Sequence, residues 1–324
     1  MVTDKRKVAL VGAGMVGMSY AYSLLNQNAC DELVLIDLNK KRAEGEAMDL
    51  NHGLAFSSAN MKIYAGEYTD CHDADIVVIC AGVAQKPGET RLALLKRNAR
   101  VFRSIIEPVT ASGFDGIFLV ATNPVDIMTR ITYVLSGFNP RKILGTGTAL
   151  DTARLRYLLG EYLRVDPRNI HAYVFGEHGD SEFVPWSQAQ LATKSILQLC
   201  DENPEIHREE LTAVEAEVQG AAYKIIEAKN ATYYGIGMAM TRITRAIFGD
   251  ENSVLTVSAM LKGEYGQTDV FAGVPCIINK NGVQRVLKLA LTQEELERLG
   301  QSCSVLRDSY EELARDGHDE ENTM

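Results

Sequence analysis

The sequence has little that would tie the protein to a membrane or to nucleic acid. No uninterrupted apolar stretch approaches the ~18 residues needed to span a bilayer, and the polar N-terminus, residues 1–7, has no apolar segment of the signal-peptide type. Basic residues are too few for a nucleic-acid footprint, because 33 Lys and Arg stand against 43 Asp and Glu and give a formal net charge of -10. We therefore expect a cytoplasmic protein without membrane or nucleic-acid partners.

The chain also lacks paired cysteines, internal repeats and low-complexity linkers. Its 6 cysteines are scattered and form no C-x-x-C pair, which is typical of reduced thiols rather than of a disulfide framework or a zinc site. A length of 324 residues is enough for two domains. Because no flexible linker separates them, these domains should pack closely, and we expect no metal centre.

The first half alternates short apolar runs with helical patterns. We expect a helix over 15–26 and strands at Val8–Val11, Leu33–Ile36, Ile76–Cys80 and Ile117–Val120, with Ile143–Leu144 as a candidate fifth. Apolar runs that do not alternate with polar residues are typical of strands buried on both faces. Such strand–helix alternation predicts an α/β fold with a doubly wound parallel sheet.

The second half has a more mixed pattern. We expect a half-exposed strand at Ile170–Phe175, a helix over 211–228, strands at Val254–Val257 and Pro275–Asn279, a hairpin at Asn281–Gly282 and an amphipathic helix over 293–313. The predicted organisation is a sheet domain in 1–146, a smaller mixed α+β domain in 147–315 and a disordered acidic tail in 316–324.

A glycine-rich turn links the first predicted strand to the first predicted helix. Gly12, Gly14 and Gly17, with Met15 and Val16 among them, form a G-x-G-x-x-G motif. Its glycines allow a tight turn and a close approach of backbone to a pyrophosphate, which the helix N-terminus then binds. Alone the motif is weak, but a strand before it and a helix after it predict a dinucleotide-binding Rossmann domain.

An acidic residue lies where such a domain contacts the adenosine ribose. Asp37 ends the second predicted strand, 20 residues after Gly17, and can accept the ribose hydroxyls unless it serves only as a helix cap. An aspartate there repels a 2′-phosphate, which favours NAD over NADP, although Arg42 is close by in the sequence. Ala81 and Gly82, after a later strand, would let the backbone approach the cofactor.

Three later segments, 82–92, 121–126 and 150–180, carry the chemistry that reducing a 2-keto acid needs. That reaction requires a hydride donor, an acid for the developing alkoxide, a cation at the carbonyl oxygen and a second cation on the carboxylate. His178 is the best acid, because histidine changes charge near neutral pH and glycines flank it. The histidines without such a setting are His52, His72, His207 and His318.

The candidate cations and their partners follow from spacing. Asp151 and Arg154 are three residues apart and share a helix face. Asp151 can orient His178, or merely cap the helix; Arg154 can grip the substrate carboxylate, or form an exposed ion pair of little worth. Arg91 follows a Pro–Gly turn and could be a lid cation or a solvated loop residue. Asn123 could bond the substrate oxygen or position the cofactor.

Together and in this order, these segments resemble the 2-hydroxy-acid dehydrogenases of the lactate/malate family over nearly the whole chain. The resemblance implies a cis peptide at Asn123–Pro124. It also implies that Thr232 and Ile236 line the pocket beside the nicotinamide. Its implied substrate-binding residues are Gln85, Arg91, Asn123, Asp126, Asp151, Arg154 and Thr232. The further cofactor contacts that it implies are Tyr68, Ser104, Ala121, Asn123, Thr146 and Ile236.

Gln85 bears on the choice of substrate. In the family, the matching position separates pyruvate from oxaloacetate, and a neutral residue leaves a second carboxylate unpaired. The resemblance therefore favours pyruvate and lactate. Malate, a longer 2-hydroxy acid and a fold without turnover remain alternatives, the last opposed by intact Asp151, Arg154, Arg91 and His178.

A candidate regulatory pair lies near the candidate catalytic residues in the sequence. Arg156 is two residues after Arg154, about 200° around a helix, so it faces away from the substrate. His171 lies seven residues before His178. Residues matching Arg156 and His171 hold fructose 1,6-bisphosphate in some members of the family, which implies an allosteric pocket across a two-fold axis of a homotetramer. Two ordinary surface residues are the alternative.

Overall fold

The computed structural model describes residues 5–83, 88 and 90–321. Its first part builds strands β1 (Lys7–Val11), β2 (Glu32–Ile36), β3 (Lys62–Ala65), β4 (Ile76–Ile79), β5 (Ile117–Val120) and β6 (Ile143–Gly145). The α-helices of this part are α1 (Met15–Gln27), α2 (Lys40–Gly53), α3 (Arg91–Ala111) and α4 (Val125–Ser136). Its short 3-10 helices are η1 (Leu54–Phe56), η2 (Tyr68–Cys71) and η3 (Pro140–Lys142).

The second part begins with helix α5 and ends with the long helix α9. Its α-helices are α5 (Ala149–Leu163), α6 (Ile196–Glu202), α7 (Arg208–Lys229), α8 (Tyr234–Phe248) and α9 (Gln293–Glu321). Its strands are β7 (Ile170–His171), β8 (Gln190–Leu191), β9 (Lys194–Ser195), β10 (Ser253–Lys262), β11 (Thr268–Asn279) and β12 (Gly282–Val286). Its 3-10 helices are η4 (Pro167–Asn169), η5 (Trp186–Gln188) and η6 (Glu264–Gly266).

One large sheet joins the two parts. Within the described ranges it has nine strands in the order β12-β11-β10-β6-β5-β4-β1-β2-β3, and a second, three-stranded sheet has the order β7-β8-β9. The six strands β1 to β6 pair in parallel with their neighbours among these six, whereas β10 pairs antiparallel with β6 and β11. Strands β1, β2, β4 and β5 are buried along their whole length, as their apolar runs predicted. The doubly wound parallel sheet is therefore confirmed.

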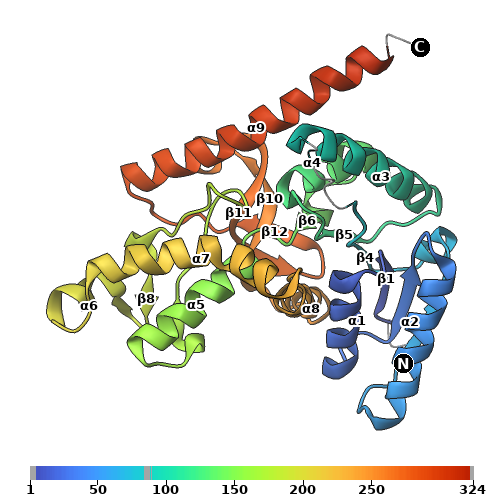
Figure 1. The fold of residues 1–324 in the computed structure, drawn as a ribbon, viewed down its shortest axis with the longest axis horizontal. Helices are drawn as coiled ribbons and strands as arrows, with labels where there is room; N and C mark the ends of the chain where they lie inside the picture. The colour runs from blue at the N-terminus through green and yellow to red at the C-terminus, as the bar shows by residue number, and fades with distance from the viewer. Residues whose placement is uncertain (1–4, 84–87, 89, 322–324) are drawn as a thin grey trace.

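The sheet topology marks where a ligand should bind. From β1 the chain runs outward through β2 to β3, then returns to β4 on the other side of β1 and continues to β5 and β6. Such a reversal opens a crevice at the carboxyl ends of the strands. Figure 1 shows α3 and α4 on one side of this sheet and α1 with α8 on the other. The segments that follow β1, β4, β5 and β6 therefore meet at one edge.

The strands of the structure differ from the predicted ones in several places, of which two are instructive. The predicted strand at 170–175 is shorter, because only Ile170–His171 form β7. Beyond it, Val174 hydrogen-bonds through its backbone to the hydroxyls of Thr148 and Thr152 rather than to a neighbouring strand. Strand β3 was not expected from the sequence, since Lys62–Ala65 lies at the sheet edge and only one of its residues is buried.

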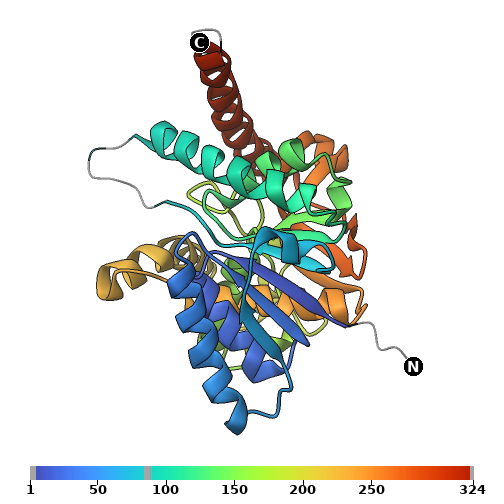
Figure 2. The same cartoon turned by 90° about the vertical axis from the view of Figure 1, so that its right-hand side faces the viewer.

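The C-terminal helix is longer than its amphipathic pattern. The sequence predicts order to about residue 315, but the backbone of α9 is helical through Glu321, and Arg315 pairs with Glu311 one turn earlier. Figure 2 shows this end of α9 projecting from the rest of the fold. Of the helices in the described ranges, none is both long enough and apolar enough to cross a membrane.

Candidate functional site

The glycine turn after β1 is shaped by close backbone contacts. Gly12 has a φ of +104°, and a Cβ there would lie 2.6 Å from the nitrogen of Ala81. A Cβ on Gly17 would lie 2.0 Å from the carbonyl oxygen of Gly12. Nothing lies within 4 Å of a Cβ built on Gly14, which caps α1 without a side-chain hydrogen bond. The turn is therefore packed on two sides and open in front of the helix N-terminus, which suits a pyrophosphate.

Asp37 braces this turn from the end of β2. Its carboxylate accepts hydrogen bonds from the backbone of Ala13, at 2.8 Å, and of Asn39, at 2.9 Å. The cap of α2 is Asn39, which accepts from Arg42, so the capping alternative for Asp37 does not apply to that helix. Arg42 is exposed, and its Nε lies 3.6 Å from Glu46.

The other predicted cofactor residues fall into two groups. Five follow the carboxyl ends of β4, β5 and β6, which meet at the crevice: Ala81, Gly82, Ala121, Asn123 and Thr146. The rest come from helices or a 3-10 turn: exposed Met15 and half-buried Val16 on α1, half-buried Tyr68 in η2, exposed Ser104 on α3 and half-buried Ile236 on α8. Among these, the Ser104 hydroxyl donates to the carbonyl of Val101 on its own helix.

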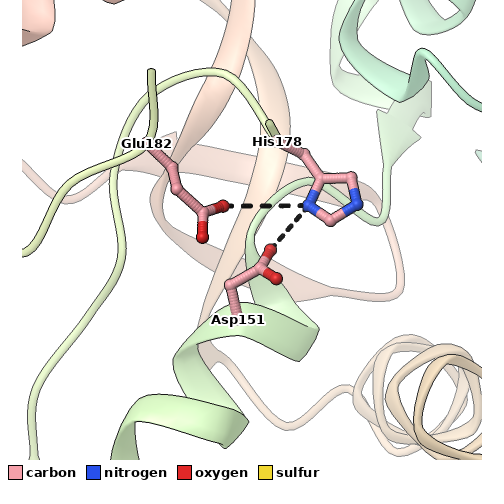
Figure 3. Close-up of side chains that lie close together, drawn as sticks. All are labelled: Asp151, His178 and Glu182. Carbon is pink, nitrogen blue, oxygen red and sulfur yellow. Dashed lines mark hydrogen bonds and ion pairs between the residues drawn. The ribbon is translucent and has the colours of Figure 1, made fainter. Parts of the chain in front are cut away.

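His178 and Asp151 form the centre of the predicted catalytic group. Nδ1 of His178 lies 2.6 Å from Oδ2 of Asp151, in the first turn of α5 (Figure 3). Burial alone would lower the pKa of His178, but the charge of Asp151 and its hydrogen bond raise that pKa to about 9. Asp151 is 1 % exposed, whereas the His178 side chain is 24 % exposed. The imidazole is thus partly exposed, and its protonated form is favoured by Asp151.

Arg154 binds the other oxygen of the same carboxylate. Its Nη1 lies 2.7 Å from Oδ1 of Asp151, one turn earlier on α5, and its side chain is 13 % exposed. Burial would raise the pKa of Asp151, yet the charges and hydrogen bonds of His178 and Arg154 lower it. The alternative interpretation of Asp151 and Arg154 as an exposed ion pair is therefore wrong, because the pair is mostly buried. Asp151 is a buried carboxylate shared by two cationic partners.

Asp126 has a different place from the predicted substrate contact. It is 2 % exposed, and its carboxylate accepts from the backbone N–H of His178, at 2.8 Å, and from the hydroxyl of Ser258, at 2.5 Å. Burial raises the pKa of Asp126 to about 6 against those two hydrogen bonds. Because both oxygens are engaged behind the His178 backbone, Asp126 fixes the catalytic loop rather than facing a ligand.

The loop that carries His178 is held from two further sides. Gly176 exchanges backbone hydrogen bonds of 2.9 and 2.8 Å with Gly273 of β11. The hydroxyl of Ser302 on α9 accepts from the backbone N–H of Glu177, at 2.7 Å. Elements more than 90 residues away in the sequence thus position the imidazole, and no local pattern around His178 predicts them.

Sequence reasoning missed Glu182. Its Oε2 lies 3.9 Å from Nδ1 of His178, and its side chain is 4 % exposed (Figure 3). One carboxylate oxygen each from Asp151 and Glu182 and a ring nitrogen of His178 lie within 4.8 Å of one another, a spacing at which the three atoms could also bind one cation. The only signal in the sequence is a spacing of four residues from His178, which carries no information about burial.

The remaining predicted site residues are less completely described. Arg91 begins α3, but its side chain lies outside the described residues, as does Gln85 entirely. Thr232, just before α8, is half-buried. The Asn123–Pro124 peptide is cis, as the family resemblance implied.

The predicted effector residues lie on neighbouring elements. The Arg156 guanidinium, on α5, donates to the carbonyl of Ala172 at 3.1 Å and lies 5.1 Å from the centroid of the Tyr173 ring. His171 is exposed on β7. Arg156 lines a cavity of about 460 Å³, whose other cationic residues are Arg168 and Arg242.

Comparison with known families gives two adjoining matches. Residues 6–145 match the model for the lactate/malate dehydrogenase NAD binding domain. Residues 148–316 match the model for the lactate/malate dehydrogenase alpha/beta C-terminal domain. The two matches together cover nearly the whole chain.

Individual relatives and solved structures agree with this result. The L-lactate dehydrogenase of Geobacillus sp. (strain WCH70) is 53% identical over 302 residues, which is 93% of this chain and 95% of that protein. The L-lactate dehydrogenase 2 of Bacillus anthracis is 51% identical over 94% of this chain and 96% of its own length. The minor L-lactate dehydrogenase of Enterococcus mundtii, in its ligands-bound form, has a TM-score of 0.94 at 48% identity and covers 95% of this chain and 98% of that one.

Proposed function

The chain belongs to the lactate/malate dehydrogenase family, and from this premise we propose that it catalyses reversible hydride transfer between NADH and pyruvate to give L-lactate. The observation that carries the proposal is the arrangement of His178, Asp151 and Arg154 at the carboxyl edge of the sheet. A protonated imidazole and a guanidinium, both held by one buried carboxylate, suit a substrate with a carbonyl next to a carboxylate.

The cofactor site fits NAD. The turn at Gly12 and Gly17 leaves the N-terminus of α1 open, and Asp37 beside it disfavours a 2′-phosphate. When bound in its reduced form, NAD supplies the hydride. By consuming NADH with pyruvate, the protein would serve cytoplasmic glycolytic fermentation, which is part of this proposal.

The chain's own residues move the proton and hold the substrate. His178 donates a proton from Nε2 to the carbonyl oxygen of pyruvate, and Asp151 stabilises the imidazolium before that transfer. Arg154 binds the substrate carboxylate through its planar fork. In the reverse direction, neutral His178 accepts the hydroxyl proton of lactate. Arg91 is proposed to polarise the carbonyl, as its place in the sequence motif implies.

Substrate choice is proposed to rest on Gln85. Changing Gln85→Arg should lower the ratio of kcat/KM for pyruvate to that for oxaloacetate by about 10- to 100-fold, because the new cation pairs with the second carboxylate. The measurement compares initial rates of NADH oxidation with the two keto acids, and Gln85→Asn is the neutral control. An unchanged ratio in Gln85→Arg would mean that position 85 does not contact the third carbon. A wild type that prefers oxaloacetate would instead identify a malate dehydrogenase.

We also propose a homotetramer that fructose 1,6-bisphosphate activates. The guanidinium of Arg156 on the cavity wall and the exposed imidazole of His171 are groups of the kind that phosphates bind. Two such pairs facing across a two-fold axis would repel until an anion neutralised them, and the α5 helix links Arg156 to Arg154.

Fructose 1,6-bisphosphate should therefore lower the KM for pyruvate and raise the oligomer mass of the wild type. The double variant Arg156→Gln, His171→Gln should lose both responses, because the phosphates lose their cationic partners. Pyruvate saturation curves and light scattering measure the two effects. An unresponsive wild type refutes the activation, and a response that survives in the double variant places the effector elsewhere.

A further inference from the structure

Glu182 is a buried acid that the proposed reaction does not use. Its backbone is fixed on both sides, since its N–H donates to the carbonyl of Gly179 at 3.1 Å and its carbonyl accepts from Gln219 of α7 at 2.7 Å. The side chain, 4 % exposed, points toward Asp151 and His178 (Figure 3). Within the described part of the chain, its Oε2 has no hydrogen-bond partner.

The donors close to Glu182 are already committed. Nδ1 of His178 is 2.6 Å from Oδ2 of Asp151, but 3.9 Å from Oε2 of Glu182. Nη1 of Arg154, on α5, is directed at Oδ1 of Asp151 at 2.7 Å. Glu182 therefore faces a carboxylate that two cations already hold, and among the described residues no donor lies within hydrogen-bonding distance of its Oε2.

A bare carboxylate in this position would be costly. An unsatisfied charged group in a dry site loses its hydration without a replacement, and two adjacent carboxylates repel. A proton on Glu182 removes both penalties, because a carboxylic acid is neutral and can donate to Asp151. Burial, followed by the negative charge of Asp151, raises the pKa of Glu182, against smaller opposing effects of His178 and Arg154.

We infer that Glu182 is carried as a neutral acid in the working enzyme, where its O–H donates to Asp151 and holds that carboxylate in line with His178. Glu182 is thus a positioning residue that acts through Asp151, and this role rests on the proposed function. The hydrogen bond draws on a lone pair that His178 and Arg154 leave free. The charged groups that act on Glu182 are Asp151 and Arg154 on α5 and His178 on the loop of Glu182 itself.

Infrared difference spectroscopy tests the protonation directly and does not depend on turnover. The spectrum of wild type minus Glu182→Gln should contain the carbonyl stretch of a protonated carboxylic acid at pH 7, and this band should disappear at alkaline pH. Glu177→Gln is the matched control, because Glu177 is also 4 % exposed but accepts from the Ser181 hydroxyl at 2.6 Å. Its difference spectrum should lack the band. Absence of the band for Glu182 would overturn the inference.

Activity then tests the positioning role. Glu182→Gln keeps a neutral donor toward Asp151 and should retain kcat within about threefold, whereas Glu182→Met, of similar size, should lower it about tenfold or more. In Glu182→Gln, the alkaline limb of kcat/KM for pyruvate should also move to lower pH by about half a unit or more, since no glutamate anion can form to sustain the imidazolium.

Other outcomes contradict the role in distinguishable ways. Equal losses of kcat in Glu182→Gln and Glu182→Met would show that the negative charge of Glu182 is needed. An unmoved pH profile of kcat/KM in all variants would mean that Glu182 contributes only to packing. Thermal unfolding of each variant separates loss of folding from loss of function. A wild type that shows the infrared band but does not reduce pyruvate would refute the proposed function and leave the protonated acid standing.

Discussion

Replacing His178→Ala should lower turnover of pyruvate by about 10²- to 10⁴-fold while NADH binding changes little. The imidazole of His178 is hydrogen-bonded to Asp151 and partly exposed, so it can reach a substrate, and general acid catalysis contributes rate factors of this size. The glycine turn and Asp37, which are proposed to hold the cofactor, do not contact His178 in any hydrogen bond of the described residues. Stopped-flow turnover and fluorescence titration with NADH measure the two quantities separately.

A loss of turnover without a loss of NADH binding is what distinguishes the catalytic role of His178 from a structural one. His207→Ala is a matched control, because its side chain is exposed at the start of α7, far along the chain from the catalytic loop. It should leave both turnover and NADH affinity unchanged. If His178→Ala weakened NADH binding severely but kept turnover at saturating cofactor, His178 would not be the acid.

Replacing Arg154→Lys should raise the KM for pyruvate by about 10- to 100-fold. A lysine keeps the positive charge, but it cannot bind Asp151 and the substrate carboxylate together through one planar fork, and each lost charge-assisted hydrogen bond contributes about 1.5–3 kcal/mol. The effect on kcat should be smaller, because the anchoring contact is made before hydride transfer as well as during it.

Saturation curves for pyruvate with fixed NADH give this result. Arg208→Lys is the control, since Arg208 is exposed and, among the residues described, pairs locally with Asp201. Unchanged KM in Arg154→Lys, together with a fall in kcat equal to that of His178→Ala, would show that Arg154 acts on the acid and not on the substrate.

The parts of the site that local spacing determines could be predicted from the sequence. The turn at Gly12 and Gly17 depends on residues a few positions apart, and a glycine is required wherever another backbone approaches within about 3 Å. Asp151 and Arg154 share a helix face for the same kind of reason. The pairing of Asp151 with His178, 27 residues apart, came from the chemistry that a keto acid requires.

The parts that tertiary packing determines could not be predicted. Asp126 follows a buried strand and was expected to face the substrate, but the hydroxyl of Ser258, 132 residues later, and the backbone of His178 take both its oxygens. Glu182 was not singled out from the sequence, because its burial depends on α5 and α7. The strand expected at 170–175 ends early since threonine hydroxyls of α5 and of the turn before it replace a neighbouring strand.

The most direct test of the account is the identity of the product. Purified protein is incubated with NADH and pyruvate, and the lactate formed is resolved into its enantiomers while NADH oxidation is followed. The account predicts stoichiometric oxidation of NADH and L-lactate alone, with reduction of NAD by L-lactate but not by D-lactate in the reverse assay. Failure to oxidise NADH with pyruvate, or formation of D-lactate, would contradict it.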